Sequence, residues 1–125
     1  MIPGSDRDHP RFLESFKYAF EGFLTAVTTE RNINVQLGVG LVAIIVGLVI
    51  GLDLLSWALI AVCVGLVVFA ELANTAMEAI VDLACSEIHP LAKRAKDIAA
   101  ASVLVLSITS AVVGVLVFAN ALLVK

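Results

Sequence analysis

Four polar side chains recur at helical spacing on one short segment, ELANTAMEAIVD, of this 125-residue chain. They are Glu71, Asn74, Glu78 and Asp82, at offsets of 0, 3, 7 and 11. At about 100° per residue, these positions fall within an arc of roughly 80° on a helix. Carboxylate and amide oxygens gathered on one side suit a hard cation such as Mg²⁺, which prefers oxygen ligands. The spacing therefore predicts an acidic stripe that can bind such an ion.

A solvated helix face is the alternative explanation for this stripe. The residues between the four polar positions are small or apolar, however, as Leu72, Met77 and Ile80 illustrate. A helix that leaves a membrane normally becomes polar on all sides, whereas here only one face is polar. An Asp at the centre of a spanning helix costs roughly 2.5 to 3.5 kcal/mol, so several carboxylates near the membrane boundary favour a functional site.

Two further polar segments could complete this site. AKRAKD places Lys93, Arg94, Lys96 and Asp97 in the first turns of the last predicted helix, and TTERN places Glu30 just before the first predicted span. Basic residues at such a boundary also act as topology signals or contact anionic lipids, which explains Lys93 and Arg94 better than Asp97. Together with the stripe, these residues predict a site for Mg²⁺ and an anion.

The elements that carry these residues are apolar enough for a membrane. Hydrophobic residues make up 61% of the chain and charged residues only 15%, more apolar side chain than a soluble core of this size can bury. About 20 apolar residues in a helix cross a hydrocarbon layer of roughly 30 Å. Hydropathy predicts three spans, at residues 34–52, 54–84 and 91–124. We therefore expect an all-α integral membrane protein.

Residues 11–30, before the spans, predict an amphipathic helix. The apolar residues Phe12, Phe16, Phe20, Phe23 and Val27 recur at spacings of four, four, three and four, while charged residues occupy other faces. A helix on the membrane surface explains this phenylalanine stripe, and packing of the stripe against the spans explains it equally well. Residues 1–10 contain two prolines and a glycine and predict a flexible lead-in.

The charges indicate topology and exclude some partners. Basic residues gather before the first span and between the second and third, which predicts that the N-terminus and the site face the cytoplasm. A net charge of -3 gives no basic surface for nucleic acid. The chain has no G-x-x-x-x-G-K-[ST] loop, no dinucleotide glycine motif and no H-R-D motif, so the familiar nucleotide motifs do not identify the anion.

The segments ELANTAMEAIVD, SEIHPLAKRAKDIAAA and TERN, in their arrangement along the chain, resemble the prokaryotic diacylglycerol kinase family over about residues 12–123. The resemblance implies one membrane kinase domain at 11–125, with an N-terminal surface helix and three spans, assembled as a homotrimer in the bacterial plasma membrane. It also implies ATP as co-substrate, Mg²⁺ as cofactor and a membrane lipid alcohol as phosphate acceptor.

The same resemblance assigns roles to individual residues. Glu71 matches the family's general base, and Asn74 would orient either that base or the phosphates. Glu30 and Glu78 match the carboxylates that hold ATP-bound Mg²⁺. The family's nucleotide-binding positions match a larger set, which consists of Lys96, Asp97, Glu87, His89, Tyr18 and Arg11.

The resemblance allows two acceptor lipids. HPLAK and TERN look more like the Gram-positive branch, whose members phosphorylate undecaprenol, than the enterobacterial branch, which prefers diacylglycerol. Asn34, Val35 and Gln36 depart from the more basic run that the Gram-positive branch often carries. We therefore expect undecaprenol as the substrate, with diacylglycerol as the alternative.

Two functions without lipid phosphorylation explain the sequence less well. A noncatalytic membrane subunit would be expected to lose at least one of the matching site residues. An ion-conducting oligomer needs polar positions along the whole helix, yet residues 54–70 contain only Ser56 and Cys63 as such positions. The hydroxyl residues of the last span, Ser107 among them, are expected to bond to their own helix or to a neighbour, or to line a lipid entry.

Overall fold

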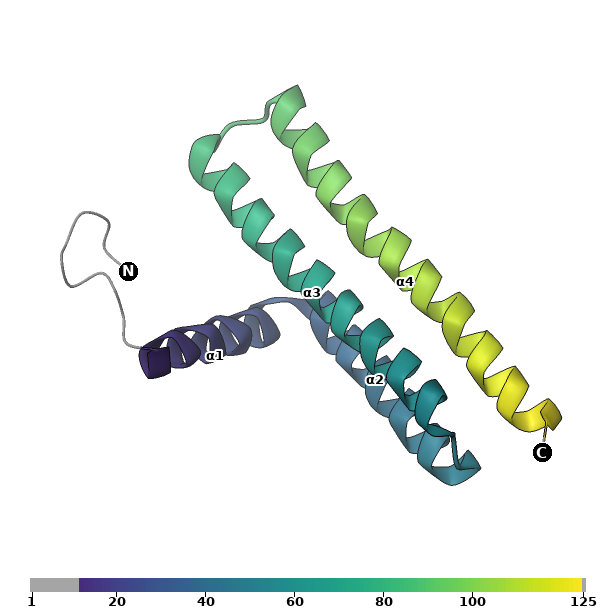
Figure 1. The fold of residues 1–125 in the computed structure, drawn as a ribbon. Coiled ribbons are helices and arrows are strands. Elements are labelled where there is room, and N and C mark those ends of the chain that lie inside the picture. The colour runs from purple at the N-terminus through teal and green to yellow at the C-terminus, as the bar shows by residue number, and fades with distance from the viewer. Residues whose placement is uncertain (1–11, 125) are drawn as a thin grey trace.

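The computed structural model describes residues 12–124, and every regular element in that range is an α-helix. The helices are α1 (Phe12–Thr29), α2 (Arg31–Ile50), α3 (Leu54–Ala84) and α4 (Pro90–Val124). Figure 1 shows α1 leaving the three longer helices at the point where α2 begins. The expected lead-in at residues 1–10, like Arg11, lies outside the described residues.

Helices α2, α3 and α4 are long and apolar enough to cross a membrane. They contain 20, 31 and 35 residues, with mean hydropathies of 2.4, 2.3 and 2.4. At 1.5 Å per residue, α2 is about 30 Å long, α3 about 46 Å and α4 about 52 Å, against a hydrocarbon layer of roughly 30 Å. The prediction of an all-helical protein with three helices able to span a membrane is confirmed.

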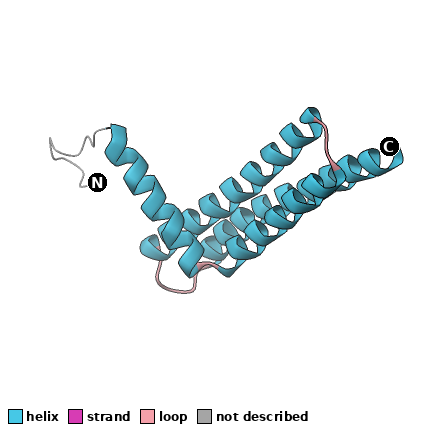
Figure 2. Ribbon diagram, turned by 90° about the horizontal axis from the view of Figure 1, so that it is seen from below, coloured by secondary structure: helices cyan, strands magenta, loops and turns pink. Residues whose placement is uncertain are grey.

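The extra length of α3 lies at one end of the molecule. Because α2 turns back into α3 within a few residues, the end of α2 and the start of α3 lie side by side at the turn. The last 11 or so residues of α3 therefore project past the start of α2, beyond the thickness that α2 alone can span. Figure 2 shows the connection from α3 to α4 at this projecting end. Asn74, Glu78 and Asp82 of the acidic stripe lie on this part of α3, and Glu71 lies just before it.

Helix α3 is the central element, and both α2 and α4 pack along it. Leu52, Ile60 and Val117 form a buried apolar cluster, with Trp57 and Phe118 packed against it. Little else is enclosed, since α4 buries only Val117 among its 35 residues. The outward apolar faces of the helices match a surrounding of lipid chains or of further subunits.

Helix α1 contacts α2 and α3, and only part of its phenylalanine stripe is covered. The exposed fractions of Phe12, Phe16 and Phe20 are 76%, 62% and 62%, whereas Phe23 and Val27 are partly buried. The rings of Phe12 and Phe16 pack edge to face with their centroids 5.0 Å apart. Packing within one chain therefore accounts for the end of the stripe nearest α2 but not for its first three rings.

A tight turn around Gly51 joins α2 to α3. Gly51 adopts a left-handed conformation, with φ of 81°, and its amide donates to the carbonyl of Gly47 at 2.9 Å. Asp53 then begins α3, because its carboxylate accepts a hydrogen bond from the amide of Ser56 at 2.8 Å. Hydrogen bonds from the Ser56 side chain and then its amide lower the pKa of Asp53.

We predict that Gly51→Ala destabilises the protein by about 1 kcal/mol, because a Cβ strains the left-handed backbone that this turn requires. The measurement is the free energy of unfolding in detergent micelles. Gly38→Ala is the matched control, since Gly38 lies inside α2 with nothing within 4 Å of an added Cβ. The control should be neutral or slightly stabilising, because alanine favours helix over glycine. Equal effects of the two changes would contradict this account of the turn.

Candidate active site

Glu71 is the most enclosed charged side chain among residues 12–124, with an exposed fraction of 3%. It lies on α3, one turn before Thr75, whose hydroxyl donates to the Glu71 carbonyl at 2.9 Å. Gln36, on α2, interacts with the Glu71 side chain from the opposite wall. A carboxylate that is buried to this extent costs free energy unless a function or a partner compensates for it.

A cavity of about 330 Å³ opens beside Glu71, between α2, α3 and α4. Its polar walls are formed by Glu71 and Asn74 from α3, Asn32 and Gln36 from α2 and Ser107 from α4. Leu104 is among its apolar walls. The cavity therefore offers a carboxylate, three amides and a hydroxyl to one partly open volume. We call it the polar cavity.

Asn74 connects the polar cavity to Glu78. Its Nδ2 donates to Oε1 of Glu78 at 3.1 Å. Its Oδ1 is buried and has no hydrogen-bond partner within the chain. Buried acceptors in folded proteins are nearly always satisfied, so this oxygen marks a place where a ligand with a donor group would be stabilised.

Glu30 lies at the junction of α1 and α2, where its backbone forms the N-cap of α2. Its side chain makes no capping hydrogen bond, so its oxygens stay available. Both Glu30 and Glu78 are near enough to interact electrostatically with Glu71. Among residues 12–124, no three His, Cys, Asp or Glu side chains come together as a closed metal site.

Lys96 contributes a positive charge to this end of the stripe. Its Nζ donates to Oδ1 of Asp82 at 2.5 Å, across the gap between α4 and α3. Its neighbour Asp97 points elsewhere, since it accepts from Lys93 at 2.6 Å within α4. The structure thus brings Lys96 to the acidic stripe, but in a single chain it does not bring Asp97 there.

The remaining candidate residues that the structure describes, His89, Glu87 and Tyr18, are not among those that line the polar cavity. His89 Nδ1 accepts from the amide of Leu91 at 3.0 Å, so this ring caps the start of α4. Glu87, in the connection before α4, accepts through its carbonyl from Cys85 Sγ at 3.3 Å. Tyr18 is 50% exposed on α1. Arg11 belongs to the part of the chain that the structure does not describe.

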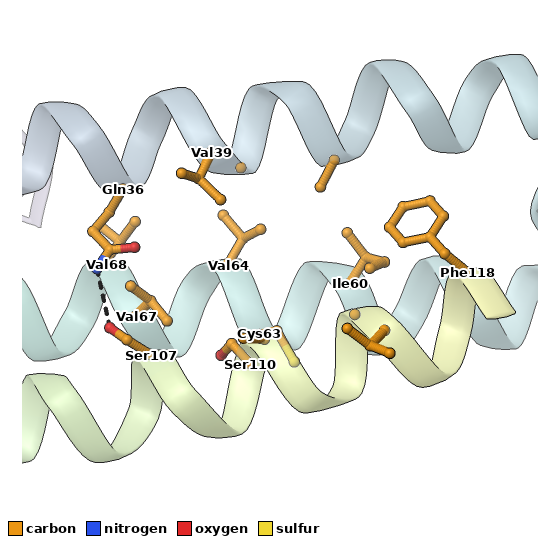
Figure 3. Close-up of a pocket in the computed structure, with 15 residues that line it drawn as sticks. Gln36, Val39, Ile60, Cys63, Val64, Val67, Val68, Ser107, Ser110 and Phe118 are labelled. Atoms are coloured by element: carbon orange, nitrogen blue, oxygen red, sulfur yellow. Dashed lines mark hydrogen bonds between the residues drawn. The ribbon is translucent and has the colours of Figure 1, made fainter.

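A second, apolar cavity of about 220 Å³ continues from the first toward the α2–α3 turn. Figure 3 shows its walls, with Val39, Val64, Ile60 and Phe118 facing the space between the helices. Gln36 and Ser107 line both cavities. The two volumes therefore meet at this pair of side chains, with a polar end at Glu71 and an apolar end at Phe118.

Gln36 donates from Nε2 to Oγ of Ser107 at 3.0 Å, as the dashed line in Figure 3 marks. Ser102 and Thr109 instead donate to carbonyls of α4 itself, those of Ile98 and Val105. The sequence predicted such bonds for these hydroxyls, to their own helix or to a neighbour, but it identified no bonding partner for Gln36. The signal that was present is a glutamine inside an apolar span, which needs a partner on another helix.

Most of the described chain matches known proteins. The family described as prokaryotic diacylglycerol kinase matches residues 17–118. An undecaprenol kinase of Bacillus subtilis is 38% identical over 108 residues, which are 86% of this chain and 88% of that protein. A diacylglycerol kinase of Synechocystis sp. is 37% identical over 106 residues, 84% of this chain and 61% of that protein. A diacylglycerol kinase of Helicobacter pylori is 31% identical over 104 residues, 83% of this chain and 81% of that protein.

We predict that Ser107→Ala destabilises the protein by about 0.6 to 2 kcal/mol, because it leaves the Gln36 amide without its acceptor between the helices. The measurement is the free energy of unfolding in detergent micelles or bicelles. Ser102→Ala is the matched control, since that hydroxyl bonds only within α4. A loss of stability as large in the control would show that the contact between α2 and α4 does not matter.

Proposed function

This chain belongs to the prokaryotic diacylglycerol kinase family and is therefore a lipid kinase, and we propose that it transfers the γ-phosphate of ATP to the hydroxyl of undecaprenol. The observation that supports this most is the position of Glu71. This buried carboxylate lines a polar cavity that continues into an apolar one. A lipid alcohol has the same two parts, a polar head and a hydrocarbon chain.

Glu71 acts as the general base in this proposal. A lipid whose chain lies in the apolar cavity presents its hydroxyl to the polar end, beside Glu71. The carboxylate takes the hydroxyl proton while the lipid oxygen forms a bond to the γ-phosphorus. The bond from that phosphorus to the bridging oxygen of ADP breaks. Protein groups contribute mainly by alignment and by balancing charge in such a transfer.

Asn74 would help to align the lipid hydroxyl with the phosphate that it attacks. Its amide nitrogen is engaged by Glu78, which fixes the direction of its buried oxygen. A donor group of the bound substrates, other than the lipid hydroxyl whose proton goes to Glu71, would satisfy that oxygen. The residue would thus connect the lipid end of the site to the phosphate end.

Glu30 and Glu78 would hold Mg²⁺ together with the phosphates of ATP. The donor set fits this ion, because Mg²⁺ usually takes one or two carboxylates and completes its shell with water and substrate phosphates. Since no three His, Cys, Asp or Glu side chains among residues 12–124 form a metal site, phosphate and water would have to supply the remaining ligands. Bound Mg²⁺ supplies positive charge that offsets the charge on the phosphates.

The nucleotide would contact residues on both sides of the α3–α4 connection. Lys96 provides an ammonium group directed at the acidic stripe. Glu87 and His89 lie on the connection itself, and Tyr18 lies on α1. Asp97 and Arg11 complete the set that the family resemblance assigns to ATP. In a homotrimer, a face of α4 such as that of Asp97 can meet a neighbouring subunit.

Undecaprenol is preferred over diacylglycerol as the acceptor. The Bacillus relative named undecaprenol kinase matches this chain over 88% of its own length, and HPLAK and TERN favour the same branch. Relatives named diacylglycerol kinase are 37% and 31% identical, so diacylglycerol is the alternative acceptor. The walls of the apolar cavity are uncharged, which suits a polyprenyl or an acyl chain.

The protein would cross the bacterial plasma membrane three times, with α1 on its cytoplasmic surface. The exposed rings of Phe12, Phe16 and Phe20 would enter the interface between lipid head groups and chains. The basic residues before α2 and at the start of α4 support a cytoplasmic site, where ATP is available. The apolar outward faces of α3 and α4 would serve both lipid contact and assembly into a homotrimer.

We predict that Glu71→Gln lowers kcat by at least about 100-fold, the usual contribution of a general base, with little change in KM for ATP. The measurement is transfer of labelled γ-phosphate to lipid in micelles with Mg²⁺. Glu21→Gln is the control, because it removes one carboxylate from the exposed face of α1. Full activity of Glu71→Gln would exclude Glu71 as the base.

We also predict a higher kcat/KM for undecaprenol than for diacylglycerol when both alcohols are offered in the same micelles. Separation of the labelled lipid products by chromatography measures this ratio. A higher value for diacylglycerol would move the assignment to the alternative acceptor. If folded protein produces no labelled lipid, the proposed transfer reaction is wrong and a noncatalytic membrane subunit is favoured.

A further inference from the structure

The ion pair between Lys96 and Asp82 joins α4 to α3 beyond the polar cavity. The exposed fractions of the two side chains are 39% and 65%, so water reaches both partners. Ion pairs this exposed add little to stability, since screening and lost side-chain entropy offset the attraction. A purely structural role is therefore a weak explanation for this contact.

The position of Asp82 suggests another role. It follows Glu78 by four residues and lies one helical turn farther along the same face of α3. The ammonium group of Lys96 interacts electrostatically with Glu78 as well as with Asp82. The Lys96–Asp82 ion pair thus keeps the Lys96 ammonium near Glu78, which is proposed to hold Mg²⁺. This ion pair lies at the end of the stripe away from Glu71.

A neighbouring lysine shows that this orientation is specific to Lys96. Lys93 pairs with Asp97 four residues along the same helix, and the two side chains are 77% and 62% exposed. That pair makes no connection to α3. Asp82 is the residue that directs one of these lysines across the gap.

We propose that Asp82 is a positioning residue for ATP, which holds the Lys96 ammonium beside Glu78 before the nucleotide binds. This inference rests on the proposed function, in which Lys96 contacts phosphate oxygens. An ammonium has three N–H donors, so it can keep its bond to Asp82 while another donor meets a phosphate. A free lysine must lose side-chain entropy when it binds, and Asp82 removes much of that cost in advance.

Asp82→Asn tests this role through the separation of KM from kcat. We expect KM for ATP to rise by about 10-fold with kcat nearly unchanged, as for other groups that orient a ligand-binding residue. Asp82→Glu keeps the charge and should restore most of the affinity. An unchanged or lower KM in Asp82→Asn would overturn the proposal, the lower value showing that Asp82 competes with phosphate for Lys96.

A double-mutant cycle shows whether Asp82 acts through Lys96. In the Lys96→Gln background, Asp82→Asn should cause no further rise in KM, because the group that it positions is absent. A rise as large as in the wild type would assign Asp82 a role independent of Lys96 and contradict the inference. Glu21→Gln is the control for loss of a carboxylate far from this contact.

Direct binding of Mg²⁺ and ATP separates this inference from the proposed reaction. Equilibrium titration in the Glu71→Gln background needs no catalysis, and Asp82→Asn should weaken the apparent Kd there by the same factor of about 10. Unaltered binding in a variant that remains folded by thermal unfolding would refute the positioning role. If Asp82→Asn weakens ATP binding as expected but the wild type labels no lipid, the positioning role of Asp82 is supported and the proposed lipid phosphorylation is wrong.

Discussion

The thickness of a hydrocarbon layer is the constraint on which the rest of this structure depends. Charged groups are costly inside roughly 30 Å of lipid, and α2 is about long enough to cross that distance once. Helices α3 and α4, with 31 and 35 residues, are longer than the distance requires. Their excess length projects past the start of α2, and Asn74, Glu78, Asp82 and Lys96 lie on this projecting part. Most of the candidate site residues therefore lie on helix length that is not needed to cross the membrane, and Glu71 lies at its border.

This arrangement places Glu71 at the transition between two environments. One turn or more beyond it along α3 come Glu78 and Asp82, which are partly or largely exposed, whereas Val67 before it is buried. On the neighbouring helices, the bond between Gln36 and Ser107 marks the place where the polar cavity meets the apolar one. In the proposed function, a base at this depth would meet a lipid hydroxyl while the lipid stays in the membrane, and would meet a phosphate while the phosphate stays in water.

The sequence predicted the long elements because hydropathy and helical spacing depend on local order alone. Glu71, Asn74 and Glu78 share a face for that reason, and the structure joins two of them by a hydrogen bond. Contacts between helices were harder to foresee. The partner of Gln36 is 71 positions away in the sequence. Lys96 pairs with Asp82 on α3, whereas Asp97 pairs within α4, and this difference depends on how α4 is rotated against α3. Roles for Asp97 and Arg11 still rest on the family resemblance.

The turn at Gly51 also bears on how the protein enters a membrane. Between Ile50 and Leu54 the chain carries a single charged group, the carboxylate of Asp53. In the proposed orientation, the hairpin of α2 and α3 inserts by moving only this short, lightly charged segment across the bilayer, while the basic residues stay behind. The energetic barrier to translocation is then concentrated in one side chain, and biogenesis of the first two spans requires no large hydrophilic loop to pass through the lipid.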